Sequence, residues 1–335
     1  MYEFVADKFN LDLKRVMDET GNIDEKKVTI EPETAMFVFG EKGEQLPSNA
    51  LRSFEAISKS FESSFPAQST TQRYKVAVVD LMILKRQKLG AFQLTKEIGA
   101  DGVEVDMGGL GNRPTFDNKL LIDSIRRQFM EKASKLGLEI PSLAMTGYYA
   151  QSFCQRPVFI QSIEDCIKTM KLMNVKVAFL PMGVQCDLIK HPDLRDSVIA
   201  RLKIAGSLAE KAGVVIGIET ALDAKEELKL LKDVGSPAIK SYFNFSNALK
   251  NGRDVITEME ILGKDNIVQI HCTDDDGVWL ENNPRLDMKK IKQALDKMQW
   301  TGWLVIERSR DAKDAGNVKK NFGANTAYVK SIFQK

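Results

Sequence analysis

Apolar and polar positions follow a repeating unit along the chain from about residue 74 onward. In each unit an amphipathic helical segment ends at a Gly or Asn, and a short run of apolar, β-branched residues follows and ends in polar residues. This order is typical of βα units. The runs predicted as strands are 75–80, 102–108, 138–146, 175–183, 214–220, 241–247, 267–274 and 303–309. Several are apolar on both faces, as parallel strands covered on both sides are.

Eight such units predict a closed barrel. The predicted helix stops, each shortly before a strand, are Gly99, Gly137, Asn174, Gly213 and Gly235. Residues 74–335 supply about the length, roughly 250 residues, that a (β/α)₈ barrel needs. An open doubly wound sheet is the structural alternative, but it usually carries a glycine-rich turn after its first strand, and residues 81–89 contain none. We therefore predict an α/β fold, a (β/α)₈ TIM barrel.

The first part of the chain does not share this repeat. It contains a candidate strand at 35–40, an amphipathic segment at 49–61 and a linker rich in Ser, Thr and Gln at 63–73. We therefore predict an N-terminal extension and linker over residues 1–73 and the barrel over residues 74–335. The extension could cap the barrel floor, swap between subunits or cover the barrel mouth.

Composition narrows the classes of partner. The chain has 335 residues, 43% of them apolar, and 48 Lys and Arg against 46 Asp and Glu give a net charge of +2. No basic block is present, so nucleic acid is not an expected partner. No apolar run approaches the roughly 20 residues that cross a bilayer, and the N-terminus lacks the order of a signal peptide. We expect a soluble, cytoplasmic protein without a membrane partner.

Cysteine and histidine exclude further kinds of site. Cys154, Cys166, Cys186 and Cys272 match neither a CxxC redox pair nor a zinc ribbon, so we expect four small buried apolar residues. His191 and His271 are the only histidines, which excludes any site that needs three imidazoles.

Polar residues end the predicted strands five to eight: Glu219, Asn244, His271 and Glu307, spaced by 25, 27 and 36 residues. Function in a barrel collects at the carboxyl ends of the strands, and the period of two lets all four side chains face the axis. Two carboxylates facing each other repel unless a cation neutralises them or one is protonated. Oxygen and imidazole ligands suit Mn²⁺, and also Mg²⁺ or Co²⁺. The alternative is ordinary strand-end acids with a core histidine.

The same segments, GVVIGIET, SYFNFSNA, IVQIHCTD and GWLVIERS, resemble strands five to eight of the xylose-isomerase-like sugar isomerase/epimerase family. The resemblance covers roughly residues 74–335. In that family a Glu, an Asp, a His and a Glu hold a Mn²⁺-type ion, and the two Glu residues exchange the substrate proton. The resemblance therefore implies Glu219, Asn244, His271 and Glu307 as metal ligands and the two Glu as catalytic residues. It also implies that Asp274 contacts either the substrate or the metal ligands, and that barrels pair in a homo-oligomer.

Asn244 departs from the family pattern, which has Asp at this place. The ligand set therefore carries a formal charge of −2 where −3 is expected, so a metal ion should be held more weakly.

Two further residues are candidates for the sugar. Arg285 lies in a loop, 282–287, where many family members have a Gly-x-Gly stretch, and it is placed to reach an anionic or polyhydroxy ligand. The alternative is a solvated loop arginine. Glu104, which we place at the end of strand two, is a candidate substrate contact. Strand ends are also followed by three aromatic residues, Tyr148, Tyr149 and Trp279, whose rings could stack on a sugar or pack in the core or at the rim.

The function favoured is that of a metal-dependent sugar isomerase or epimerase. It would act on a ketose or keto-sugar by proton abstraction next to the carbonyl, through an enediolate. One of Glu219 and Glu307 would act as base and the other would return the proton, either to the same carbon, for epimerisation, or to its neighbour, for isomerisation. A dehydratase or lyase acting on a keto-sugar or keto-glycoside is an alternative. A carbohydrate-binding barrel without catalysis is another, and Asn244 is the feature that motivates it.

Overall fold

The computed structural model describes residues 2–24, 26, 32, 42, 46–48, 50, 53–54 and 73–334. Contacts within the chain divide it into two units, Met1–Ser69 and Thr70–Lys335. The candidate strand at 35–40 lies outside the described residues, and so does most of the amphipathic segment at 49–61.

The described part of the first unit is small. Helix α1 spans Tyr2–Phe9, and a 3₁₀ turn, η1, spans Leu13–Val16. Asp12 begins this turn because its side chain accepts a hydrogen bond from the backbone N–H of Lys14, a local cap.

The second unit is a closed barrel of eight parallel strands in sequential order. The strands are β1 Tyr74–Val79, β2 Gly102–Asp106, β3 Ser142–Ala144, β4 Val177–Pro181, β5 Val215–Glu219, β6 Ile239–Asn244, β7 Ile267–His271 and β8 Gly302–Ile306. Pairing of β1 with β8, from Tyr74 opposite Gly302 to Val78 opposite Ile306, closes the barrel. The predicted TIM barrel is confirmed, and all eight predicted strands are present.

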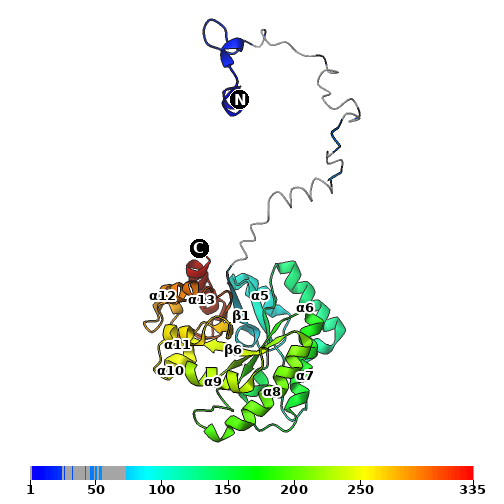
Figure 1. Ribbon diagram of the computed structural model, residues 1–335, viewed down its shortest axis with the longest axis vertical. Coiled ribbons are helices and arrows are strands. Elements are labelled where there is room, and N and C mark those ends of the chain that lie inside the picture. The colour runs from blue at the N-terminus through cyan, green and yellow to red at the C-terminus, as the bar shows by residue number, and fades with distance from the viewer. Residues whose placement is uncertain are drawn as a thin grey trace. The chain divides into compact units, whose positions relative to one another are not determined.

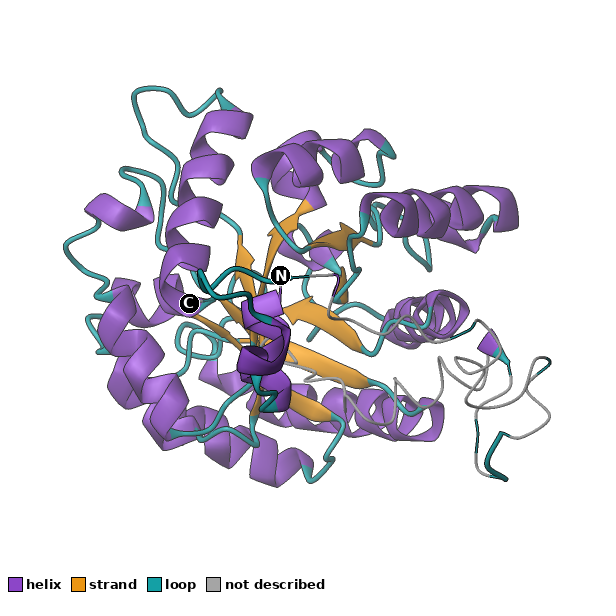
Figure 2. Cartoon of the chain, turned by 90° about the horizontal axis from the view of Figure 1, so that it is seen from above, coloured by secondary structure: helices purple, strands orange, loops and turns teal. Residues whose placement is uncertain are grey.

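Helices follow the strands and surround the barrel (Figures 1 and 2). They are α4 Asp80–Leu84, α5 Gly90–Ile98, α6 Asp123–Leu136, α7 Phe159–Met173, α8 Arg195–Ala212, α9 Ala224–Val234, α10 Phe245–Lys250, α11 Val255–Leu262, α12 Met288–Lys297 and α13 Val318–Phe333. Short 3₁₀ turns are η3 Lys119–Leu121, η4 Thr146–Tyr149, η5 Pro192–Leu194 and η6 Leu280–Asn282. Apolar side chains between the sheet and these helices form two large buried clusters.

The predicted helix stops are the left-handed C-caps of α5, α6, α7, α8 and α9, in that order: Gly99, Gly137, Asn174, Gly213 and Gly235. Asn174 adopts φ 54° there, a conformation that asparagine tolerates better than most residues with a side chain.

Most strands are shorter than predicted, and β3 differs most from its prediction. The pattern indicated 138–146, but β3 begins only at Ser142. Glu139 makes an isolated bridge with Gly102, and Pro141 interrupts the ladder because it has no N–H to donate.

A small cluster of apolar side chains lies apart from the two large ones: Ala77, Val79, Ala144, Phe179, Tyr242 and Val305. These residues come from five of the strands and fill the barrel beneath the strand ends. Gly217 makes room for the largest of them, because a Cβ at this position would lie 3.0 Å from Cβ of Tyr242. The barrel is therefore packed below its carboxyl end, which leaves that end for chemistry.

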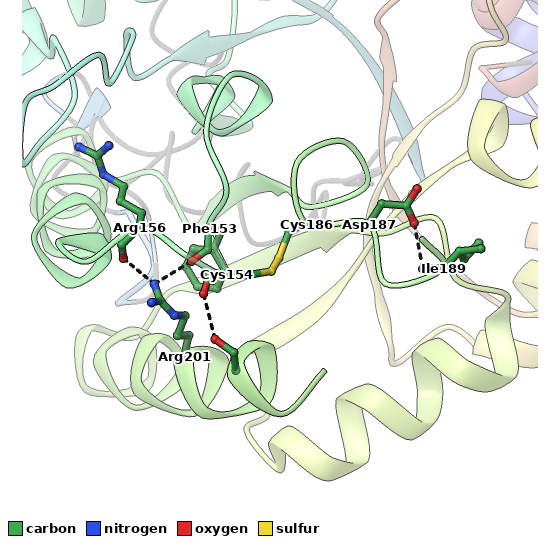
Figure 3. The surroundings of a disulfide bond; sticks show 8 residues. Phe153, Cys154, Arg156, Cys186, Asp187, Ile189 and Arg201 are labelled. Carbon is green, nitrogen blue, oxygen red and sulfur yellow. Dashed lines mark hydrogen bonds between the residues drawn. A yellow bond between two sulfur atoms is a disulfide. The ribbon is translucent and has the colours of Figure 1, made fainter. Parts of the chain in front are cut away.

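Two of the four cysteines form a disulfide, which corrects the expectation of four free thiols. Cys154, in the segment between β3 and α7, is bonded to Cys186, in the segment between β4 and α8 (Figure 3). Ser197 donates to the carbonyl of Cys154, and Arg201 donates to the carbonyl of Phe153, so α8 also holds this segment. Cys166 and Cys272 are free and buried, as expected. The pair was missed because 32 residues separate its members in sequence, whereas the fold brings their Cα atoms within 5.8 Å.

Among the described residues, no helix is both long and apolar enough to cross a membrane.

Candidate active site

The four polar residues predicted to end strands five to eight lie together at the carboxyl end of the barrel. Glu219, Asn244 and His271 are the last residues of β5, β6 and β7, and Glu307 directly follows β8. His271 pairs with Asn244 on one side and with Val305 on the other, so these strands end at the same height. All four side chains are buried, with at most 6% of each residue exposed.

Hydrogen bonds join the four side chains into one group. Nδ1 of His271 lies 2.9 Å from Oε2 of Glu219 and 3.7 Å from Oε2 of Glu307. Nδ2 of Asn244 donates to the same two oxygens, at 2.8 Å and 3.4 Å. The two carboxylates therefore face the same imidazole and the same amide.

The group also makes a hydrogen bond with the backbone. Oδ1 of Asn244 accepts a hydrogen bond from the N–H of Ser246 at 2.9 Å, which caps the N-terminus of α10. The amide oxygen of Asn244 thus bonds to the helix, and its amide nitrogen bonds to the carboxylates.

The environment moves the pKa values of the group in different directions. Burial raises the pKa of Glu219, but hydrogen bonds from His271 and Asn244 outweigh burial and hold it below its usual value. Burial raises the pKa of Glu307; the charge of His271 opposes this shift, the charge of Glu219 adds to it, and the net pKa lies above the usual value. Burial opposes protonation of His271, yet the carboxylates around it hold its pKa well above the usual value. The shifts of the two carboxyl groups therefore differ in direction although both groups are buried.

Three of the four residues fit a divalent cation. One ligand atom from each of Glu219, His271 and Glu307 lies within 4.8 Å of the other two, so one ion can contact all three. Asn244 does not fit as a ligand in the orientation seen, because its amide nitrogen, which cannot bind a cation, faces the carboxylates. The expectation that Asn244 is a fourth ligand stays a prediction.

Glu104 lies deeper than expected. It is in the middle of β2 rather than at its end, and it is completely buried. Its Oε2 accepts hydrogen bonds from Ser142 at 2.6 Å and from Tyr242 at 2.7 Å. Its Oε1 has no hydrogen-bond partner and lies 3.5 Å from Nε2 of His271, which has none either. Glu104 therefore approaches the imidazole from the barrel interior, and its contact with a substrate stays a prediction.

Asp274 and Arg285, the other two candidates for the sugar, contact each other. Oδ2 of Asp274 lies 3.3 Å from Nε of Arg285 and accepts a hydrogen bond from Asn283 at 2.9 Å. Asp274 is buried, whereas the side chain of Arg285 is 47% exposed. Within the described residues, no hydrogen bond or ion pair joins this pair to Glu219, His271 or Glu307.

Tyr149 contacts the site through its hydroxyl, a role that the sequence did not indicate. It lies in η4, directly after β3, and its hydroxyl donates to Oε1 of Glu307 at 3.0 Å. The sequence signal was its place after a strand end, which indicated an aromatic face for stacking but not the role of its hydroxyl. Because Tyr149 occupies Oε1, only Oε2 of Glu307 faces His271 and Asn244.

The fold and this cluster of acids define the class of protein as a TIM barrel with its polar site at the carboxyl ends of strands five to eight. A model of the family described as xylose isomerase-like TIM barrel matches residues 92–331. The chain belongs to this family, as the sequence resemblance predicted.

Individual relatives agree with this family. A 2-epi-5-epi-valiolone 7-phosphate 2-epimerase from an Actinoplanes species is 28% identical over 199 residues, which are 55% of this chain and 67% of the relative. The structure of a D-psicose 3-epimerase from Clostridium cellulolyticum H10 superposes with a TM-score of 0.63 at 13% identity, covering 78% of this chain and all of the other. A 3-keto-D-glucoside 4-epimerase from E. coli gives a TM-score of 0.61 at 15% identity, covering 77% and 99%. The chain is an isomerase/epimerase-like barrel.

Proposed function

We propose that the protein is a metal-dependent isomerase or epimerase that moves a proton next to the carbonyl of a ketose or keto-sugar. The observation that carries this proposal is the pair of buried carboxylates, Glu219 and Glu307, that face one imidazole and one amide at the carboxyl end of the barrel. The relative named 2-epi-5-epi-valiolone 7-phosphate 2-epimerase supports the same reaction class.

The residues of this chain supply the parts that proton transfer needs. Glu219 and Glu307 act as the acid–base pair, one accepting the proton next to the carbonyl and the other returning one. Tyr149 and Asn244 hold Glu307 by different oxygens, so its free lone pairs have a fixed direction. A divalent ion, Mn²⁺ or else Mg²⁺ or Co²⁺, held by Glu219, His271 and Glu307, would stabilise negative charge on the carbonyl oxygen when bound. The carbon that receives the returned proton decides between epimerisation and isomerisation.

The pair formed by Asp274 and Arg285 supports a substrate with several hydroxyl groups. Asp274 and Arg285 lie between β7 and α12, and β7 is next to β8, the strand that Glu307 follows. We propose that they bind hydroxyl or anionic groups of the sugar away from the reacting carbon.

Deuterium exchange tests the reaction directly. A panel of ketoses and keto-glycosides is incubated with the protein and Mn²⁺ in D₂O, and incorporation is followed by NMR beside Glu307→Gln. We expect incorporation next to the carbonyl of at least one sugar with the wild type and its loss in the variant. Absence of incorporation in the whole panel would overturn the proposal, and loss of water or of a glycosyl group would instead identify an elimination.

The position of Asn244 supports a second candidate, a carbohydrate-binding barrel without catalysis. Its amide nitrogen occupies the place between the carboxylates where an oxygen ligand was expected. This candidate predicts sugar binding with the same affinity before and after treatment with a chelator, and no deuterium exchange.

A further inference from the structure

The amide of Asn244 makes hydrogen bonds in two opposite directions. Its Oδ1 accepts from the N–H of Ser246 at 2.9 Å, and its Nδ2 donates to Oε2 of Glu219 at 2.8 Å and to Oε2 of Glu307 at 3.4 Å. The residue is 6% exposed, so water does not replace these partners easily.

These contacts fix which end of the amide faces the carboxylates. If the amide turned over, its NH₂ group would meet the N–H of Ser246, a donor against a donor, and its oxygen would meet two carboxylate oxygens. Both ends would then lose their partners inside the protein, where an unpaired polar group is costly. Helix α10 therefore holds the donor of Asn244 toward the acids.

We propose that Asn244 is a positioning residue that holds the two carboxylates together with its two N–H donors and leaves the cation only three protein ligands. This inference rests on the proposed function for the roles of Glu219 and Glu307. The amide does part of the task of a cation, because each N–H offsets the repulsion between two carboxylates that share a site. The pair is consequently assembled before any ion binds.

Aspartate at the same position would behave differently. One of its oxygens could accept from the N–H of Ser246 while the other faced the site, so an aspartate can cap α10 and bind a cation at the same time. Without a cation, however, its second oxygen would lie beside two other carboxylates and repel both. A single change at residue 244 therefore separates a site that is assembled without an ion from a site that requires one.

The test measures Mn²⁺ binding to the full chain by isothermal titration calorimetry and by the shift of the thermal midpoint. We expect Asn244→Asp to bind Mn²⁺ more tightly than the wild type, on the order of tenfold or more, because the ligand set gains an oxygen and a charge. Without Mn²⁺ this variant should melt at a lower temperature than the wild type, and Mn²⁺ should raise its midpoint by more. Asn251→Asp, on the exposed side at the end of α10, makes the same charge change and should match the wild type.

A second variant keeps the proposal falsifiable if the aspartate variant does not fold. Asn244→Ala removes the amide oxygen, so it should bind Mn²⁺ within a few-fold of the wild type if that oxygen is not a ligand. A loss of Mn²⁺ binding in a folded Asn244→Ala, or an Asn244→Asp that binds no more tightly than Asn251→Asp, would overturn the proposal.

Neither readout depends on turnover of a sugar. If deuterium exchange is absent but Asn244→Asp gains affinity for Mn²⁺, the proposed reaction fails and the role of Asn244 stands. If exchange is present and the gain is absent, the role of Asn244 fails and the reaction stands.

Discussion

Buried carboxylates occur at strand ends in both halves of the barrel, and the groups that bind them differ. In the first half, Asp80 accepts hydrogen bonds from the backbone N–H groups of Asp106 at 3.0 Å and of Gln87 at 2.9 Å. Asp106 pairs with Arg86, with Nε 2.9 Å from Oδ1, and accepts from the hydroxyl of Thr146. Backbone donors, a guanidinium and a hydroxyl thus bind these oxygens.

In the second half the partners are of another kind. Glu219 and Glu307 contact His271, Asn244 and Tyr149, and no Lys or Arg of the described residues forms an ion pair with either acid. Burial raises the pKa of Glu307, but it also raises that of Asp106, to about 6, so a raised pKa does not separate the two halves. The comparison teaches that the two pairs of acids differ in the kind of partner and not in burial, and we propose that this difference separates structural acids from the acid–base pair.

The largest expected effect tests directly whether the two halves differ in this way. Glu307→Gln should reduce deuterium exchange into a substrate by roughly 10²- to 10⁴-fold, the usual loss of a general acid or base, without loss of stability, because one of two repelling charges is removed. Asp106→Asn should keep most of the exchange, because Asp106 contacts Arg86 and Thr146 and not the proposed acid–base pair. Exchange kinetics and urea unfolding measure both variants. Equal losses of exchange in the two would show that the halves do not differ in this way.

The disulfide gives the next largest effect and belongs to the first half of the barrel. It joins the segments that follow β3 and β4, and Arg201 and Ser197 hold one of them on α8 (Figure 3). A crosslink over 32 residues should contribute about 3–4 kcal/mol to the free energy of unfolding. Urea unfolding with and without a reductant measures this contribution, and a Cys154→Ala, Cys186→Ala double variant, on which the reductant should have no effect, is the control. A wild type that is equally stable in reductant would contradict the prediction.

The same crosslink bears on where the protein works. Disulfides persist in oxidising compartments and are rare in the cytosol. The expectation of a cytoplasmic location stays a prediction, and the bond between Cys154 and Cys186 argues against it. Counting thiols in the denatured, unreduced protein should give two, Cys166 and Cys272.

Much of the barrel could be predicted from the sequence because its signals are local. Apolar runs and helix stops such as Gly99 and Asn174 lie within a few residues of the elements that they define. The convergence of Glu219 and Glu307 could also be predicted, since every strand of a closed barrel ends at the same rim and the period of two sets the direction of each side chain.

The parts that were missed depend on contacts between distant residues. Tyr149 and Glu307 are 158 residues apart, and no local pattern predicts that a hydroxyl on one reaches the other. The direction of the Asn244 amide depends on which hydrogen bonds its two ends can make, and so it required the positions of Ser246 and Glu219 together. The depth of Glu104 was misjudged because the pattern places a strand to within a few residues only, and two residues decide between the mouth and the interior of a barrel.

A buried acid behind the second half of the barrel sharpens the comparison through pH. Glu227, on α9, accepts a hydrogen bond from Thr220, and burial raises its pKa to about 7. The folded state favours the protonated form of Glu227. Its contribution to the free energy of unfolding is therefore fully present below about pH 4.5 and is lost as the pH rises through about 7. Glu227→Gln should therefore be more stable than the wild type at pH 8, by up to about 3 kcal/mol, and nearly equal to it at pH 4.

Urea unfolding of the wild type and this variant at both pH values measures the difference. Glu226→Gln, the exposed neighbour of Glu227 on α9, is the matched control and should follow the wild type at both. If Glu227→Gln and the wild type keep a constant difference between pH 4 and pH 8, Glu227 does not titrate with a raised pKa.

The smallest expected effect concerns Glu104, which lies in the first half of the barrel and approaches His271 in the second half. Its Oε1 lies 3.5 Å from Nε2 of His271, and both atoms lack other partners. A proton on Nε2 would therefore face Glu104 and leave the lone pair of Nδ1 toward Glu219, which is the form of the imidazole that binds a cation. Glu104→Gln should weaken Mn²⁺ binding by about tenfold, the usual cost of losing a group that orients a ligand.

Nitrogen NMR of protein labelled at histidine can read this tautomer with little overlap, because the chain has only two histidines and His191, which is exposed, serves as an internal reference. In Mg²⁺-loaded protein, we expect the signals of His271 to report a proton on Nε2 in the wild type and a mixture of tautomers in Glu104→Gln. Ser142→Ala removes one of the two hydroxyl groups that donate to Glu104 but leaves the carboxylate facing His271. It should therefore keep the wild-type spectrum and Mn²⁺ affinity. If Ser142→Ala changed the spectrum and the Mn²⁺ affinity as much as Glu104→Gln does, the packing around residue 104 would orient the imidazole. The carboxylate of Glu104 would then have no separate role in coupling the two halves of the barrel.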